Sequence, residues 1–264
     1  MPRIPGHQLS RYRERNSTAD RALDVLAMFD DEHPVVSGVE AASRLGVARS
    51  TAYRYLQSLV RAHFLEEAPS GGYRLGMRFM DLGRLVRKVY DLSDIAAPVL
   101  ADLAARTGET ALITKRVGDL AVCLDLAESE VHRLRISYER GATLPLNAGA
   151  SALVLLAWED TESARRTLER LDLQPFTPAT LTDVNELLGR LERIRSDGYA
   201  VARSELDDDV IGIAAPIFRA GTLVAAISVA AVASRVPRSR ERRITEEVRG
   251  AATTISERLT LVEG

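Results

Sequence analysis

The chain has 264 residues, of which 46% are hydrophobic and 27% charged, with 35 Lys and Arg against 37 Asp and Glu. These values are typical of a soluble globular protein with one large or two ordinary domains. No apolar run approaches the roughly 18 residues of a membrane helix, and the polar first 16 residues lack the apolar core of a signal peptide. We therefore expect a cytoplasmic protein with no membrane partner.

Cysteine and histidine are scarce. The single cysteine, Cys123, excludes an internal disulfide, and four scattered histidines offer no zinc cluster. We expect neither a metal nor a cofactor.

Charge is divided unevenly along the chain. Residues 1–90 contain 14 Lys and Arg and 10 Asp and Glu, a net charge of +4, whereas residues 91–264 contain 21 and 27, a net charge of −6. Such an asymmetry indicates that the first part meets a polyanion and the second does not. Only two of the cations are lysines, so the placement of an arginine is more informative than its presence.

The N-terminal part predicts short helices joined by tight turns. Residues 1–16 predict a flexible, arginine-bearing arm, either disordered or in contact with DNA phosphate. A first helix starts at Ser17 or Thr18 and ends before Pro34. Ser37 and Glu40 then form a capping box for a helix over Val39–Leu45, which Gly46 ends.

The next helix has two distinct faces. Its apolar residues Ala52, Leu56, Leu59 and Val60 form one stripe, and the opposite face carries arginine, serine, tyrosine and glutamine but no carboxylate. An ordinary solvated helix would mix glutamates with its arginines, whereas a helix that enters the major groove needs donors and no repulsive charge. The pattern therefore predicts a helix-turn-helix. We expect the DNA contacts to come from Ser37, Arg49, Ser50, Thr51, Tyr53, Arg54, Gln57 and Arg74.

A hairpin and a linker follow this helix. Two short strands flank the turn Pro69–Gly72 and predict the wing of a winged helix-turn-helix, in which Arg74 contacts either phosphate or solvent. We place the DNA-binding domain at residues 17–76 and a linker or dimerisation helix at residues 77–91.

Residues 92–264 alternate between strand and helix patterns, which predicts an α+β domain with a mainly antiparallel sheet. We expect Ser93 to cap a helix that ends at Gly108. Strands are expected at residues 110–116, 120–126, 133–138, 199–203, 213–218 and 223–232, and helices at 149–158, 162–171, 183–196 and 240–262.

No catalytic constellation is evident in this domain. His132 is its only histidine, and the chain contains no GxSxG, P-loop or GxGxxG motif. The acidic run from Glu205 to Asp209 suits a solvated loop better than a cation site, and Cys123 suits a buried core position better than a redox sensor. We therefore expect no enzyme.

A binding site is the better expectation. The segment LPLNAGASALVLLAW places small residues at the start of a helix, where free backbone amides suit a carboxylate. Tight packing of the helix on the sheet explains the same small residues equally well.

The motifs together resemble the IclR family of bacterial transcriptional regulators. The resemblance begins near Thr18 and rests on ARSTAYRYLQSLVRAHFLE, YRLG, LPLNAGASALVLLA, DGYAV and IAAPIF…AAISVA in this order. It implies a winged helix-turn-helix, a linker helix that helps dimerisation and a GAF-like effector domain. It also implies a homodimer or dimer of dimers on palindromic DNA operators, switched by a small-molecule effector that is often an organic or aromatic acid. The effector residues that it implies are Asn147, Gly149, Ala150, Ser151, Val210, Gly212 and Ser228.

The sequence departs from the family pattern at four pocket positions. Asn147 replaces a frequent histidine, Gly212 a cysteine, Ala202 an acidic residue and Ala230 a serine. We expect a roomier, more apolar pocket than that of a sensor of small carboxylic acids.

The sequence thus predicts an effector-responsive transcriptional regulator, either repressor or activator. Two alternatives remain at this point: a DNA-binding protein whose C-terminal domain only oligomerises, and, less favoured, an enzyme.

Overall fold

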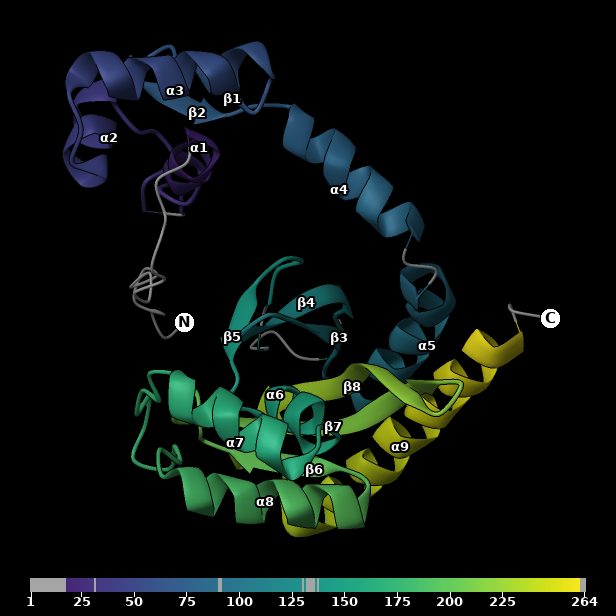
Figure 1. The fold of residues 1–264 in the computed structure, drawn as a ribbon. Coiled ribbons are helices and arrows are strands. Elements are labelled where there is room, and N and C mark those ends of the chain that lie inside the picture. Colours follow the sequence, from purple (N-terminus) through teal and green to yellow (C-terminus); the bar gives the residue numbers. More distant parts are fainter. Residues whose placement is uncertain are drawn as a thin grey trace. The chain divides into compact units, whose positions relative to one another are not determined.

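The computed structural model (Figure 1) describes residues 18–30, 32–89, 92–129, 131, 136 and 138–261, without the side chains of residues 84–89. The chain divides into two compact units, one reaching residue 90 and the other starting at residue 91, and each is considered by itself. This division falls inside the expected linker at 77–91. The expected arm at 1–16 and Ser17 lie outside the described residues.

The first unit is a winged helix-turn-helix. Val25, Val36, Leu56 and Leu65 are buried at its centre, where the apolar stripes of the helices meet the hairpin. The hairpin is antiparallel and pairs Glu66 with Arg74. Its elements are α1 (Thr18–Leu26), α2 (Gly38–Leu45), α3 (Arg49–Arg61), β1 (Leu65–Glu67), β2 (Tyr73–Leu75) and α4 (Arg78–Val89).

Local capping explains where α2 begins and ends. The Ser37 hydroxyl accepts a hydrogen bond from the Glu40 amide at 3.1 Å, as expected. The Glu40 carboxylate does not take the reciprocal role predicted for it, since it pairs with Arg44 at 2.6 Å. Gly46 has a φ of 64°, the left-handed conformation that makes the turn into α3 possible.

The second unit is built on a six-stranded antiparallel sheet in the order β5-β4-β3-β8-β7-β6. This confirms the α+β prediction. The strands are β3 (Thr110–Val117), β4 (Leu120–Ala127), β5 (Thr143–Pro145), β6 (Ala200–Arg203), β7 (Val210–Arg219) and β8 (Thr222–Val232). The helices are α5 (Leu92–Thr107), α6 (Ala150–Ala157), α7 (Thr161–Arg170), α8 (Val184–Asp197), the 3-10 helix η1 (Ala233–Arg235) and α9 (Arg238–Leu261).

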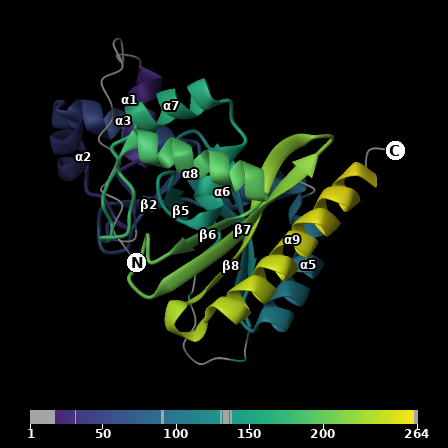
Figure 2. The same cartoon turned by 90° about the horizontal axis from the view of Figure 1, so that it is seen from below.

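Helices cover both faces of this sheet. Helices α5 and α9 lie side by side on one face (Figure 2), where they pack on Ile213, Ile217 and Ile227. Helices α6, α7 and α8 cover the other face, where Ala214 and Ala226 point. Alternate residues of a strand point to opposite faces of the sheet. The large side chains therefore pack against α5 and α9, and the alanines on the opposite face let α6 approach the sheet closely.

Three predictions about this unit need comment. Residues 133–135 and 137 lie outside the described residues, while Ile136 and Tyr138 are described and are not in a strand. The outer partner of β4 is instead β5, which the sequence did not predict. Helix α5 already includes the buried Leu92, so Ser93 lies in its first turn and the prediction that it is the cap was wrong.

None of the helices in the described part of the chain is both long and apolar enough to span a membrane.

Candidate functional site

The outer face of α3 presents donors to solvent. Arg49, Ser50, Tyr53, Arg54 and Gln57 are exposed and Thr51 is half-buried, while Ala52, Leu56 and Leu59 anchor the opposite face. The structure thus brings the predicted recognition residues onto one surface. Ala48 precedes the helix and makes no side-chain cap, so the first amides of α3 have no competing side-chain acceptor there.

The arginines of the first unit have different roles. Arg44 is used internally, because it pairs with Glu40 and donates to the Met28 carbonyl at 3.4 Å. Arg61 contacts the Ser58 hydroxyl at 3.5 Å. Within the described residues, no carboxylate contacts Arg49 or Arg54. These two guanidinium groups are therefore available to a phosphate or a guanine edge.

Two contacts position the polar side chains of α3. The Tyr53 ring packs over the start of α2, where a Cβ at Gly38 would lie only 2.6 Å from Tyr53 Cζ. Gln57 Nε2 donates to the Tyr73 hydroxyl at 3.5 Å, which links α3 to the wing. Ser37 lies beside this face, exposed, with its hydroxyl oxygen already capping α2.

Arg74 lies on the wing and is half exposed, but it is not free. Its Nε lies 2.9 Å from Glu66 Oε1, across the hairpin. An exposed pair of this kind is weak, and a DNA phosphate can compete for it. With Glu66 and Glu67 against the single Arg74, the wing carries a net charge of −1.

A cavity lies where the sequence resemblance places the effector. It is bounded by the start of α6, by β3, β7 and β8, and by the loop at 204–209. Of the seven effector residues, six line it: Gly149, Ala150, Ser151, Val210, Gly212 and Ser228.

Asn147 is the exception. It is buried, and its Nδ2 donates to the carbonyls of Gln174 and Leu181 at 3.3 and 3.2 Å. Its amide holds the loop between α7 and α8 in place and lies outside the cavity lining.

The cavity measures only about 40 Å³, and the expectation that it is roomier than the pocket of a small-acid sensor stays a prediction. A Cβ at Gly149 would lie 2.8 Å from Leu206 Cδ1, so the Leu206 side chain closes over the helix start. A Cβ at Gly212 would lie 3.3 Å from that of Ala150, so α6 takes the space a larger residue would fill. A ligand larger than one or two waters needs the 204–209 loop to move.

Glu205 takes up the anion position at the start of α6. Its Oε2 accepts from the Gly149 amide at 3.2 Å, and its Oε1 lies 3.8 Å from Arg190 Nη2. Burial raises the pKa of the Glu205 carboxyl, while the Gly149 amide and Arg190 act in the opposite direction. The place expected for a ligand carboxylate thus holds a carboxylate of the chain itself.

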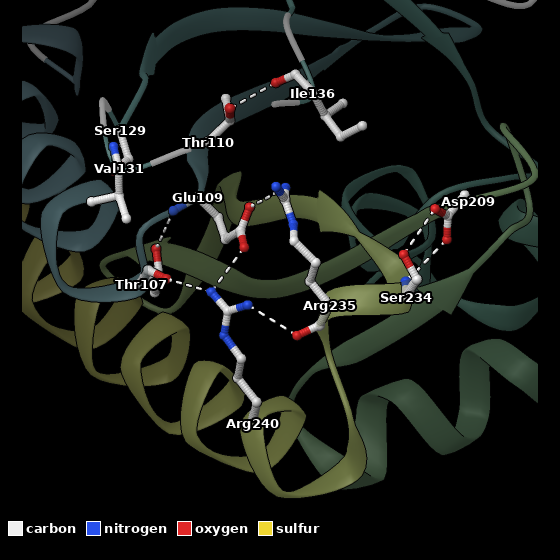
Figure 3. A network of polar contacts seen from close by, with 10 residues as sticks. All are labelled: Thr107, Glu109, Thr110, Ser129, Val131, Ile136, Asp209, Ser234, Arg235 and Arg240. Carbon is white, nitrogen blue, oxygen red and sulfur yellow. Dashed lines mark hydrogen bonds and ion pairs between the residues drawn. The ribbon is translucent and has the colours of Figure 1, made fainter. Parts of the chain in front are cut away.

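The loop carrying Glu205 is fastened to its surroundings. Thr177 and Thr180 donate to the carbonyls of Ser204 and Glu205, both at 2.6 Å. At the other end, Asp209 accepts from the amide and hydroxyl of Ser234, each at 3.0 Å (Figure 3). These contacts connect the cavity wall to the segment that leads from β8 into α9.

Nine residues that line the cavity are not among the predicted effector contacts. Two of them, Ala202 and Ala230, stand at positions where the sequence departs from the family pattern. Burial raises the pKa of Tyr138 to about 12, so this hydroxyl stays neutral and able to donate. Apart from Ala202 and Ala230, which the resemblance marks as pocket positions, no sequence signal assigns these residues, because they come from five separate segments. They are Leu112, Thr114, Tyr138, Leu144, Ala202, Glu205, Leu206, Val229 and Ala230.

The residues weighed for chemistry have structural surroundings. Cys123 is buried in the sheet, and burial raises its pKa to about 11, which suppresses the reactive thiolate. The acidic residues of the 204–209 loop diverge, since Glu205 points to α6 and Asp209 to Ser234. His132 lies outside the described residues.

Comparison with known proteins assigns both units to one family. Residues 18–69 match the model of the IclR helix-turn-helix domain, and residues 85–257 match that of the bacterial transcriptional regulator IclR C-terminal domain. The HTH-type transcriptional regulator KipR of Bacillus subtilis (strain 168) is 30% identical over 246 residues, which cover 93% of this chain and 98% of KipR.

Solved structures agree with this assignment. An IclR transcriptional regulator from Alicyclobacillus acidocaldarius superposes with a TM-score of 0.79 at 28% identity, covering 91% of this chain and 98% of that one. An IclR homolog from Microbacterium hydrocarbonoxydans complexed with 4-hydroxybenzoate superposes with a TM-score of 0.80 at 26% identity, covering 92% and 99%. The chain belongs to the IclR family and is a DNA-binding transcriptional regulator, not an enzyme.

Proposed function

We propose that this regulator binds a palindromic operator as a homodimer or dimer of dimers, and that a small-molecule effector in the cavity beside α6 changes its affinity for DNA. A regulator of chromosomal operators works in the cytoplasm, which is where we place it. The observation that carries the DNA-binding part is the outer face of α3, where Arg49 and Arg54 have no carboxylate partner within the described residues.

The proposed DNA contacts divide into two classes. Arg54 and Gln57 lie on the exposed face of the recognition helix, where side chains reach base edges, and Arg74 lies on the wing, where phosphate is the nearer target. Ser37, Arg49, Ser50, Thr51 and Tyr53 complete the proposed interface.

Arg54→Ala tests the recognition surface. Loss of a base contact should weaken binding to the operator by about 1–3 kcal/mol, roughly five- to 150-fold, and weaken random duplex much less. Arg74→Ala should instead weaken operator and random DNA by similar factors. Fluorescence anisotropy at fixed salt on an operator found by footprinting the protein's own promoter measures both. An unchanged operator preference in Arg54→Ala would show that α3 does not read the bases.

The effector part of the proposal rests on the cavity and its lining. Ser151, Ser228 and Tyr138 supply hydroxyl groups to an otherwise mainly apolar wall. An aromatic acid suits this combination, and the family member crystallised with 4-hydroxybenzoate provides the first compound to test. For such a ligand to reach the Gly149 amide, Glu205 has to leave it.

A thermal-shift screen of metabolites that starts with 4-hydroxybenzoate tests the effector part. A ligand that raises the unfolding temperature of the wild type should do so much less in Ser228→Ala, and equally in the exposed control Ser196→Ala. If Ser228→Ala responds like the wild type, the ligand binds elsewhere. If no ligand changes the unfolding temperature, the second unit serves oligomerisation alone.

A further inference from the structure

A second hollow in the C-terminal unit lies outside the effector cavity. It is an open cleft of about 770 Å³ where α8, the end of β6 and the start of α9 meet. Its charged side chains are Arg190, Arg203, Arg238, Arg242, Glu205 and Glu241. Four guanidinium groups thus face two carboxylates in a domain whose net charge is negative.

The two carboxylates are already engaged. Glu241 Oε2 lies 2.8 Å from Arg203 Nη2, and Arg203 also donates to the carbonyls of Ala233 and Val236. Glu205 accepts from the Gly149 amide on the cavity side and lies 3.8 Å from Arg190. Arg238 and Arg242 are exposed and have no ionic partner in the described portion of the chain.

The placement of these two arginines is electrostatically unfavourable. They stand four residues apart in the first turns of α9, so they share one face of the helix and repel each other. The start of a helix carries partial positive charge, which favours anions and opposes cations. Both effects disfavour arginine at these positions, and a bound anion would reverse both.

The fold does not require arginine at either position. Helix α9 packs on the sheet through Ile244, Val248 and Ile255, on its other face. Arg240, between the two, is the structural arginine of this turn (Figure 3): it bonds to the buried Glu109 and to the Thr107 carbonyl. Arg238 and Arg242 make no comparable contact to the described residues.

We propose that this cleft binds a small, multiply charged anion, namely a metabolite bearing a phosphate or pyrophosphate group. Guanidinium groups match phosphate geometry in pairs, and the pair Arg238 and Arg242 suits an anion with several oxygens better than a single carboxylate. Arg190 and Arg203 add positive charge beside this pair, although both are already bonded within the unit. A volume of about 770 Å³ accommodates a phosphorylated metabolite. The site differs from the effector cavity and borders it only at Glu205.

Pyrophosphate is the probe for this site, titrated calorimetrically into the full-length protein at low salt. The test variant is Arg238→Gln/Arg242→Gln, and the matched control Arg166→Gln/Arg258→Gln removes two exposed charges from outside the cleft. We expect the test variant to bind pyrophosphate at least tenfold more weakly and the control to bind like the wild type. Equal affinity in test and control variants would overturn the proposal.

Two further measurements distinguish a local anion site from a loss of folding and from DNA binding. The unfolding temperature of the test variant should equal or exceed that of the wild type, because the substitution relieves repulsion. Such a result would show that the loss of pyrophosphate binding is local and does not come from unfolding. Arg54→Ala should leave pyrophosphate binding unchanged. If Arg54→Ala loses pyrophosphate binding, the anion binds at the DNA surface and the proposal is wrong. The proposal is also wrong if the test variant still binds pyrophosphate but no longer binds random duplex DNA, because the two arginines then belong to DNA binding.

Discussion

The carboxylate of Glu205 lies between the Gly149 amide, 3.2 Å from its Oε2, and Arg190, 3.8 Å from its Oε1. Because burial raises its pKa, the folded state penalises the charged form. A raised carboxyl pKa stabilises the folded state fully at a pH below the pKa of the unfolded chain, near 4.5. This stabilisation is lost as the pH rises through the pKa of the folded protein. The wild type therefore carries a stability cost at neutral pH that disappears on acidification.

Glu205→Gln should remove this pH dependence. Glutamine keeps an acceptor oxygen for the Gly149 amide but carries no charge, so the variant should unfold at a higher temperature than the wild type at pH 7. The difference should vanish below about pH 4.5. If 4-hydroxybenzoate is a ligand, its carboxylate should bind about tenfold more tightly, since like-charge repulsion is gone.

Calorimetric unfolding between pH 4 and 8 measures the stability part. Asp208→Asn is the control, because Asp208 is exposed in the same loop and should show no such difference. If Glu205→Gln gains the same stability at every pH, the gain does not come from removing the buried negative charge of Glu205.

Gly38 lies against Tyr53, one of the proposed DNA contacts. Its added Cβ would meet Tyr53 Cζ at 2.6 Å and the hydroxyl oxygen at 2.9 Å, so Gly38→Ala must displace the ring. Alanine is the better helix former, so stability should change by less than about 1 kcal/mol. Operator affinity should fall by about 1–2 kcal/mol because the outer face of α3 is rearranged.

Anisotropy and thermal unfolding of Gly38→Ala, measured in parallel, check this prediction. Gly189→Ala in α8 is the matched control, since its Cβ would meet nothing within 4 Å. Unaltered operator binding in Gly38→Ala would mean that the position of Tyr53 does not matter for recognition.

The shared outer face of α3 could be predicted from the sequence, whereas the contact that closes the cavity could not. Residues of α3 share a face because they belong to one helix, and helical spacing is visible in the sequence. The contact between Glu205 and the Gly149 amide joins residues 56 positions apart. No periodicity encodes such a contact, so the sequence alone favours a solvated loop for the acidic run.

At the scale of elements, the start of α9 is fixed by a buried carboxylate. Glu109 is 1% exposed, and its two oxygens lie 2.8 Å from Arg240 and 3.3 Å from Arg235 (Figure 3). Glu109 connects α5 to β3, and the arginines belong to η1 and α9. One carboxylate thus ties the beginning of the sheet to the helix that covers it.

Glu109→Gln should destabilise the protein by about 3 kcal/mol, because two partly buried guanidinium groups lose their counter-charge. Asp102→Asn is the control: it breaks an exposed pair with Arg106 at 3.4 Å and should destabilise the protein far less. Urea unfolding of the full chain measures both. Similar losses for the two variants would contradict a structural role for the buried cluster.

Helix α8 could be predicted from the sequence and strand β5 could not, for a physical reason. Helix α8 begins after Asp183, whose carboxylate caps it, and ends at Gly198, so its bounds are encoded locally. Strand β5 has three residues, and among the described strands it pairs with β4 alone. Its segment, Thr143–Pro145, includes a proline and carries no alternation long enough to detect.

At the scale of the whole molecule, the charge asymmetry follows the division into two units. The net charge is +4 up to residue 90 and −6 beyond it, and the chain divides at this point. DNA affinity should therefore depend steeply on salt through the arginines of the first unit alone. The mildly acidic average of the chain conceals two units with opposite electrostatic character.

The start of α4 offers a surface for the proposed dimer. Met77, the residue before α4, and Met80, in the first turn of α4, are 68% and 63% exposed and stand three residues apart. Two-fold symmetry would bury such an apolar pair against its copy and place two recognition helices on half-sites about one DNA turn, or a multiple of it, apart.

Met77→Glu/Met80→Glu should disrupt this contact, because it brings four carboxylates together at the symmetric interface. We expect a smaller mass by light scattering at micromolar concentration and at least tenfold weaker operator binding, since each half-site is then bound separately. Val117→Glu adds a carboxylate at another exposed apolar position, 59% exposed, and should change neither quantity. If the methionine variant keeps both the mass and the operator affinity of the wild type, the dimer forms through another surface.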